Sequence, residues 1–243
     1  MSETLKILNT LTQTISISGD EKNVGKCMAQ YLEPYCDEIV YDNLGSVFGV
    51  KKSKKENAKR VLVITHMDES GLMITKINDN GSAEFIEIGK INKQYLPGSR
   101  LRVKTKTGEV NAFVVGTEKM VIDFGTYSKE ETLALGVFVG DSAVVDGPFV
   151  KVQKQCISKA LESRCLMAVE LLKAVKDKEL DFDLYVGACV MEEVGQRGAT
   201  TATGLVKPDL GVVLGCKKAK TLDEKDQSVG ELGKGLLVSF YDK

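Results

Sequence analysis

Three unbroken aliphatic runs, separated by longer polar or amphipathic stretches, constrain the fold of this chain more than any other feature. The runs are "RVLVITH" (60–66), "DFDLYVGACVM" (181–191) and "DLGVVLGC" (209–216). Strands that are covered on both faces read as continuous hydrophobic runs, whereas half-exposed strands alternate between apolar and polar residues. We therefore expect all three runs to be buried strands of one sheet.

Amphipathic segments lie between these runs. "SGDEKNVGKCMAQYLEPYC" (18–36) and "SKALESRCLMAVELLKAVKDK" (158–178) place apolar residues three or four apart, which indicates helices with one buried face. We expect the second helix to open at Ser158. "EIVYDNLGSVFGVKK" (38–52) is typical of two strands joined by a turn. Strands that alternate with helices predict an α/β fold, with a mostly parallel sheet and helices on its faces.

The middle of the chain, from Gly71 to Val152, has a different pattern. Short strand-like segments are separated by turn signals such as "NDNG" (78–81) and "TKTGE" (105–109). One short helix is expected in "SKEETLALG" (128–136), where Ser128 and Glu131 form a capping box. The spacing predicts a small β-barrel or β-sandwich over residues 71–152, inserted into an α/β domain made of residues 1–70 and 153–243.

The charge balance limits the classes of partner. Lys and Arg number 33 and Asp and Glu number 34, so the net charge is close to zero. Nucleic acids and anionic membranes attract proteins with an excess of basic charge, and we expect neither as the main partner. The local exception, "KKSKKENAKR" (51–60), is either a solvated loop between two strands or a binding tract.

The compartment is predicted from what the sequence lacks. The start, "MSETLKILNTLTQ", has no basic region followed by an apolar core, and no apolar run is long enough to span a bilayer. The six cysteines are scattered without a C-x-x-C pair, as expected for small buried side chains in a reducing compartment. A cytoplasmic location is therefore expected.

Residues that could bind a ligand or take part in catalysis lie at or just after the end of each aliphatic run. His66, the one histidine of the chain, ends the first run, Glu192 and Glu193 follow the second, and Gly215 and Cys216 end the third. In an open α/β sheet, ligands bind beyond the carboxyl ends of the strands. Glu162 adds a fourth position, close to the start of the helix expected from Ser158, where the helix dipole favours an anion.

Histidine and carboxylates that converge at strand ends have the ligand types of a zinc or cobalt hydrolase site. Asp68 lies two residues after His66 and is placed to fix the tautomer of a ligating imidazole. Of two adjacent glutamates, one can hold a metal while the other takes a proton from bound water. Each feature also has a structural explanation, because a single histidine, a charged helix start and a solvated glutamate are common in proteins without such a site.

Taken together, the motifs resemble one family. "THMDESGLMITKI" is similar to the family's H-M-D-E-I-G-L-M stretch, "SKALESRCLMAVELL" to S-K-A-L-D-D-R-x-G, and "VMEEVGQRGATTA" to Q-E-E-V-G-x-R-G-A. "DFGTYSKEETLALGVFVGDSAVVDGPF" and "LGKG" match two further landmarks. The match runs in order over nearly the whole chain. The chain therefore resembles the glutamyl aminopeptidase and tetrahedral aminopeptidase family, whose members have also been labelled endoglucanases.

The resemblance implies a cytosolic exopeptidase with two bound zinc or cobalt ions, which removes N-terminal residues from peptides. It implies a catalytic α/β domain that carries a small domain of barrel or PDZ-like shape. Carried over position by position, His66 binds the first metal and Asp68 orients it. Glu192 is then the general base, and Glu193 binds the second metal.

Three positions depart from the family pattern. Glu162 stands where the family has an aspartate that bridges the two metals, and Gly215 stands where it has an aspartate that binds the first metal. Cys216 is next to Gly215, but neighbouring strand residues point to opposite faces. The family's second metal-binding histidine lies in a region beyond "FYDK", where this sequence ends. We therefore expect His66, Glu162 and Glu193 as the remaining metal ligands, with weak or absent metal binding.

Three functions follow from this set. The first is a member that binds peptides or partners with little or no hydrolysis. The second is a working aminopeptidase with a rebuilt or partner-completed site, and the third is a structural or regulatory subunit that uses the β insert as an interface. An incompletely covered sheet normally finds a partner, so we also expect self-association or a complex with a full-length relative.

Overall fold

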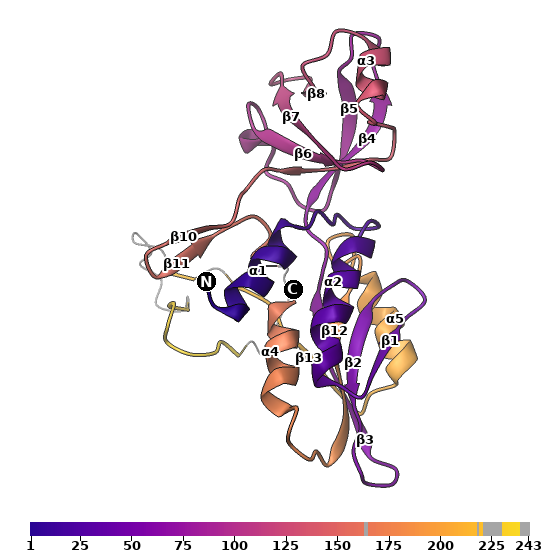
Figure 1. The fold of residues 1–243 in the computed structure, drawn as a ribbon, viewed down its shortest axis with the longest axis vertical. Helices are drawn as coiled ribbons and strands as arrows, with labels where there is room; N and C mark the ends of the chain where they lie inside the picture. The colour runs from indigo at the N-terminus through magenta and orange to yellow at the C-terminus, as the bar shows by residue number, and fades with distance from the viewer. Residues whose placement is uncertain (163–164, 218, 221–229, 239–243) are drawn as a thin grey trace.

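The computed structural model describes residues 1–162, 165–217, 219–220 and 230–238. Figure 1 shows a β-barrel at one end of the long axis and a sheet with helices on both of its faces at the other. The barrel is built by the middle of the chain, and the α/β part by the segments before and after it.

The α/β part contains strands from both of these segments. Its helices are α1 (Glu3–Gln13), α2 (Lys22–Leu32), η1 (Glu33–Tyr35, a short 3-10 helix), α4 (Leu166–Val175) and α5 (Arg197–Val206). Its strands are β1 (Glu38–Tyr41), β2 (Val47–Lys51), β3 (Lys59–His66), β12 (Phe182–Cys189) and β13 (Leu210–Val213). A separate hairpin, β10 (Val150–Val152) and β11 (Gln155–Ile157), projects beside α1.

The sheet is mixed, which corrects the expectation of a mostly parallel one. Its described strands follow the order β1-β2-β12-β3-β13; β12 and β13 both pair in parallel with β3, whereas β1–β2 and β2–β12 are antiparallel. The cause is the tight turn between β1 and β2, since a short turn can join only antiparallel strands. In that turn the Asp42 carboxylate accepts hydrogen bonds from the amides of Leu44, Gly45 and Ser46, at 2.8–2.9 Å.

Helices cover the two faces of the sheet. Helices α1, α2 and α4 pack on one face, where Val63 and Val186 join their core, and α5 packs on the other face against Leu62. Successive residues of a strand point to opposite faces, which is why Leu62 and Val63 belong to different cores. The continuous apolar runs in β3 and β12 are explained by this double cover.

The third aliphatic run does not have that cover. Strand β13 lies at the edge of the sheet, and Leu210, Val212 and Val213 are 56%, 38% and 76% exposed among the described residues. The expectation of a buried strand is therefore wrong for β13. An apolar run reports a preference for strand, whereas burial depends on the elements that surround it.

The helix expected from Ser158 begins only at Leu166. Ala160 adopts a left-handed φ of +54°, which an α-helix does not accommodate. Lys159 is bound elsewhere: its amide donates to the Gly147 carbonyl at 3.0 Å, and its ammonium forms a buried ion pair with Glu69 at 2.6 Å.

The middle of the chain folds as a closed antiparallel barrel, one of the two shapes expected from the turn pattern. Its strands, all within the described residues, follow the order β4-β5-β8-β7-β6-β9 around the barrel. They are β4 (Gly71–Ile77), β5 (Ala83–Ile88), β6 (Arg100–Lys104), β7 (Glu109–Val115), β8 (Val121–Asp123) and β9 (Ser142–Val145). The short 3-10 helix η2 (Lys93–Tyr95) and helix α3 (Lys129–Ala134) interrupt them. The division of the chain into domains at residues 71 and 152 stays a prediction.

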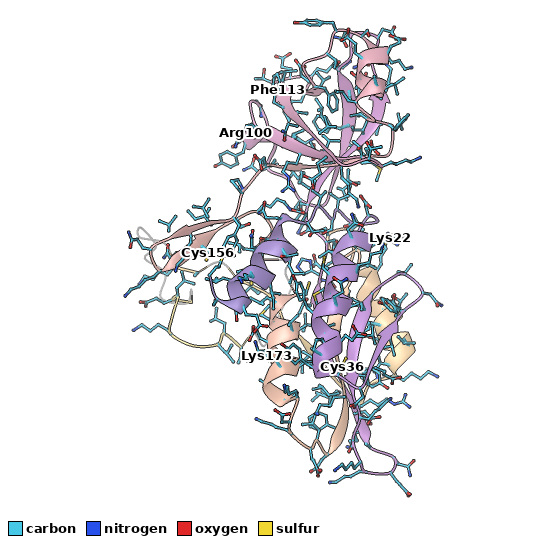
Figure 2. All side chains as sticks on the ribbon, in the orientation of Figure 1. Lys22, Cys36, Arg100, Phe113, Cys156 and Lys173 are labelled. Atoms are coloured by element: carbon cyan, nitrogen blue, oxygen red, sulfur yellow. The ribbon has the colours of Figure 1, made fainter. Side chains whose placement is uncertain are left out.

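Figure 2 labels two of the six cysteines, which lie on different parts of the molecule. Cys36 is on the α/β part and Cys156 is on the projecting hairpin. All six cysteines lie in described residues, and none of them forms a disulfide. No described helix combines the length and the apolar character that crossing a bilayer requires.

Candidate active site

Parallel pairing brings the ends of β3 and β12 to one place. His66, the last residue of β3, is paired with Cys189, the last residue of β12. The residues that follow both strands therefore emerge at the same edge of the sheet. The sequence prediction that His66, Asp68 and Glu192 come together agrees with this geometry, and the contacts below describe it.

Asp68 is the centre of this edge. Its side chain is fully buried, and its two carboxylate oxygens accept hydrogen bonds from the Ser18 hydroxyl at 2.6 Å and the amides of Glu192 and Glu193 at 3.1 and 3.0 Å. Burial alone would raise the pKa of the Asp68 carboxyl, but the His66 imidazole, the Ser18 hydroxyl and the two amides hold it below its ordinary value. Asp68 is therefore a charged group that fixes the turn after β12.

The His66 imidazole lies beside two carboxylates. Its Nδ1 atom lies 3.5 Å from Asp68 Oδ1 and 3.9 Å from Glu192 Oε2, and it makes no hydrogen bond within the described part of the chain. Burial opposes protonation of the imidazole, but Asp68 and then the glutamate pair raise the pKa of His66 above its ordinary value. Asp68 thus lies beside the imidazole, as predicted, at a distance longer than a good hydrogen bond.

The two glutamates point to different neighbours. The Glu192 carboxylate is 38% exposed and lies beside His66, so it can take a proton from a water molecule. The Glu193 carboxylate instead accepts a hydrogen bond from the Ser70 hydroxyl at 2.7 Å. Gly89 leaves room for it: a Cβ at that position would lie 2.7 Å from Glu193 Oε2, and the φ of +80° is itself unfavourable for other residues.

Glu162 takes no part in the contacts described above. It is exposed, and it precedes α4 instead of belonging to its first turn, so the helix dipole does not act on it as expected. Its neighbour is Cys216: although that residue is exposed as a whole, burial of its thiol and the Glu162 carboxylate raise the pKa of Cys216. Gly215 has open space around it, with no atom within 4 Å of where a Cβ would be.

The candidate donors therefore do not form one group within the described residues. Across residues 1–162, 165–217, 219–220 and 230–238, no three His, Cys, Asp or Glu side chains converge in a way that could hold a metal ion. A catalytic zinc normally has three protein ligands and a water molecule. The buried Nδ1 of His66, without a hydrogen bond, is of suitable chemistry, but the described donors as arranged do not fit a metal centre with three protein ligands.

Several residues of this edge were not found from the sequence. Ser18, Glu21 and Ser70 hold its backbone or its carboxylates, and Lys159 pairs with Glu69 immediately after Asp68. All these contacts join segments far apart in the chain. The one local signal is the polar stretch "SGDE" (18–21) directly before α2, which has the composition of a helix start.

The chain is similar to proteins of known class. The sequence profile of M42 glutamyl aminopeptidase matches residues 45–243. The glutamyl aminopeptidase of Lactococcus lactis is 32% identical over 97% of this chain and 72% of its own. The TET aminopeptidase from a marine sediment archaeon, Thaumarchaeota archaeon SCGC AB-539-E09, has 31% identity and a TM-score of 0.89, over 96% of this chain and 72% of its own.

A third relative carries information on assembly. The TET1 peptidase of Pyrococcus horikoshii has 27% identity and a TM-score of 0.80, and the comparison covers 92% of this chain and 72% of that one. That peptidase can assemble into a tetrahedron or a large octahedral shell. With a profile match over most of its length and a relative of this identity along nearly all of it, the chain belongs to the M42 glutamyl aminopeptidase family.

Proposed function

We propose that this member of an aminopeptidase family binds the N-terminal end of peptides and hydrolyses them weakly or not at all. In this proposal Glu192 is the general base and Asp68 orients His66. His66, Glu162 and Glu193 are the residues available to a zinc or cobalt ion, which binds weakly. Membership of the family supports the substrate class.

The observation that carries the proposal is the separation of the donors. His66 lies beside Asp68 and Glu192, Glu193 is bound to Ser70, and the charge of Glu162 acts on the pKa of Cys216. An ion that joined His66, Glu162 and Glu193 would require these side chains to move together, because they do not converge as they stand. Weak metal binding follows, because the energy of that rearrangement is subtracted from the energy of coordination.

The direct test is a calorimetric titration with zinc and with cobalt, followed by assays against a panel of aminoacyl anilides. We expect at most one weakly bound ion per chain and little turnover. Two tightly bound ions per chain would overturn the proposal. Any turnover is assigned to this site by Glu192→Gln, which keeps the shape of the side chain and removes the base.

A working aminopeptidase is the second candidate, because His66, Asp68, Glu192 and Glu193 are all present at the edge of the sheet. A site completed by a second subunit would give activity that rises with protein concentration. Steady-state assays at increasing enzyme concentration separate the two: activity per subunit is constant for a self-contained site and rises for a shared one.

We propose in addition that the chain self-associates. The exposed aliphatic edge strand β13 supports this, because open apolar strand edges pair with other chains. The assembly of the TET1 peptidase is consistent with it. Sedimentation velocity provides the test, and a monodisperse monomer at micromolar concentration would count against it. A cytoplasmic location is part of the same proposal and is supported by the lack of a disulfide bond among the six cysteines, all of which lie in described residues.

A further inference from the structure

Three consecutive backbone amides around the glutamate pair each donate to a buried carboxylate. The Met191 amide donates to Glu21 Oε1 at 2.9 Å, and the Glu192 and Glu193 amides donate to the two oxygens of Asp68 at 3.1 and 3.0 Å. Asp68 belongs to the segment that follows His66. Glu21, in contrast, has no role in the proposed function.

Glu21 is an unusual residue to find in this position. It is 6% exposed, and it lies at the start of α2, 170 positions before Met191 in the sequence. Burial of a carboxyl group is costly unless its oxygens accept hydrogen bonds. The hydrogen bond between them therefore gives the buried Glu21 carboxylate a donor and the Met191 amide an acceptor.

The backbone conformation of Met191 depends on the contacts around it. It has a φ of +55°, a left-handed conformation that residues other than glycine rarely adopt. Such a conformation persists only where the surrounding contacts impose it. A flip to an ordinary φ would rotate the following peptide groups, and with them the directions of the Glu192 and Glu193 side chains.

The same short segment holds both sides of the turn. Ser18 donates to Asp68, which holds the second and third amides, and Glu21 holds the first. On the far side, the Met191 carbonyl accepts from the Arg197 amide at 3.2 Å, which links the turn to α5. The turn is therefore fixed at both ends, and Glu21 provides the contact at its first amide.

We propose that Glu21 is a positioning residue, which sets the direction of Glu192 and Glu193 by holding Met191 in its left-handed conformation. Glu21 does not reach the reacting atoms. The proposal rests on the proposed function for its catalytic consequence, but its structural part stands without any activity.

Three substitutions test it. Glu21→Gln keeps an oxygen acceptor of the same reach, Glu21→Leu removes it at similar volume, and Glu21→Asp withdraws it by one methylene. The matched control is Glu131→Leu, because Glu131 in the barrel also accepts a backbone hydrogen bond, from Tyr127 at 2.8 Å. If Glu21→Leu does not fold, the aspartate variant takes its place.

The first measurement is amide hydrogen exchange of Met191 to Glu193, made on the protein without added metal. We expect wild-type exchange in Glu21→Gln and in Glu131→Leu, and faster exchange, on the order of tenfold, in Glu21→Leu and Glu21→Asp. Unchanged exchange in the last two variants, or an equal increase in Glu21→Gln, would overturn the proposal.

The second measurement is kcat and KM against an aminoacyl anilide, with cobalt present. We expect kcat to fall by about tenfold in Glu21→Leu with little change in KM, and Glu21→Gln to restore kcat. A general loss of structure would change both constants and would not be rescued by glutamine. If the wild-type protein shows no turnover, the hydrogen-exchange result alone decides whether Glu21 positions the turn. The proposed function is tested separately, by the affinity of the wild-type protein for cobalt.

Discussion

Strands β12 and β13 flank β3 on its two sides, both in parallel, yet they contribute very differently to the site. Strand β12 is buried and is followed by a turn in which buried carboxylates accept three successive amides. Strand β13 is exposed and is followed by Gly215, with open space where a side chain would be. Both strands pair in parallel with β3, yet the β12 side is held by buried polar contacts and the β13 side is open.

The difference shows that register alone does not build a site. Pairing places the ends of β3, β12 and β13 at one edge, but among the described residues buried polar contacts fix the turn on the β12 side alone. Functional side chains need supporting hydrogen bonds to hold a productive geometry. Four substitutions probe the two sides, and they are ordered by the expected size of the effect.

The largest effect is expected from Asp68→Ala. It leaves the partly buried amides of Glu192 and Glu193 without an acceptor, which should cost about 3 kcal/mol or more in the free energy of unfolding. Urea denaturation followed by circular dichroism measures it. The control on the open side is Asp209→Ala, which removes an exposed acceptor of the Arg60 amide and should cost about 1 kcal/mol or less. Equal costs would contradict the contrast between the two sides.

On the open side, next to β13, the substitution Gly215→Asp should strengthen metal binding. No atom lies within 4 Å of the added Cβ, and the backbone there is not left-handed, so the substitution meets no strain. A new carboxylate beside the end of β3 should tighten cobalt binding by about 10- to 100-fold, the range seen when supporting groups of metal sites are altered. Calorimetric titration gives the affinity. Gly211→Asp, at an equally open position of β13, should leave it unchanged.

Ser18→Ala should have a smaller effect, and it depends on pH. The hydroxyl bond stabilises the charged form of Asp68, so its removal should cost about 1–2 kcal/mol at neutral pH and raise the pKa of Asp68. Because that pKa is lowered in the folded protein, the contribution is present above the unfolded value, about 3.9, and is lost as the pH falls through the folded value.

Denaturation of wild type and Ser18→Ala from pH 7 to pH 2.5 checks the sign. The two stability curves should converge in acid. A difference that is constant over this range would mean that Ser18 acts by packing and not through the charge of Asp68.

The smallest effect on stability is expected from Val213→Lys on β13. The side chain is 76% exposed, so the free energy of unfolding of the single chain should change by no more than about 0.5 kcal/mol. A lysine on an open edge discourages pairing with another chain, so sedimentation velocity should show less self-association. Val152→Lys, exposed to 45% on the projecting hairpin, is the control and should leave the association unchanged.

The strands of the sheet were largely predictable, and their environment was not. The runs that became β3 and β12 contain enough aliphatic residues to indicate burial on two faces, and the family motifs indicated a site at their ends. The run that became β13 has the same composition but lacks cover among the described residues. The composition of a strand indicates that it can be buried, whereas burial itself depends on whether other elements of the chain pack against it.

The same limit applies to the site. His66, Asp68 and Glu192 were predicted to meet because strand ends are a local property that pairing brings together. Glu162 was misplaced because Ala160 is left-handed and Lys159 is drawn to Glu69, neither of which the helical spacing of 158–178 reveals. Glu21 was missed because its one informative partner lies 170 residues away.

Gly89 joins the barrel to the site in a way that bears on how members of this family can diverge. A Cβ there would strike both the Ser70 hydroxyl and the Glu193 carboxylate, at 2.6 and 2.7 Å. A side chain at this position would therefore disturb the site directly. A randomised library of the barrel, selected only for an intact Glu193–Ser70 contact, should therefore return glycine at position 89 while its exposed surface drifts freely.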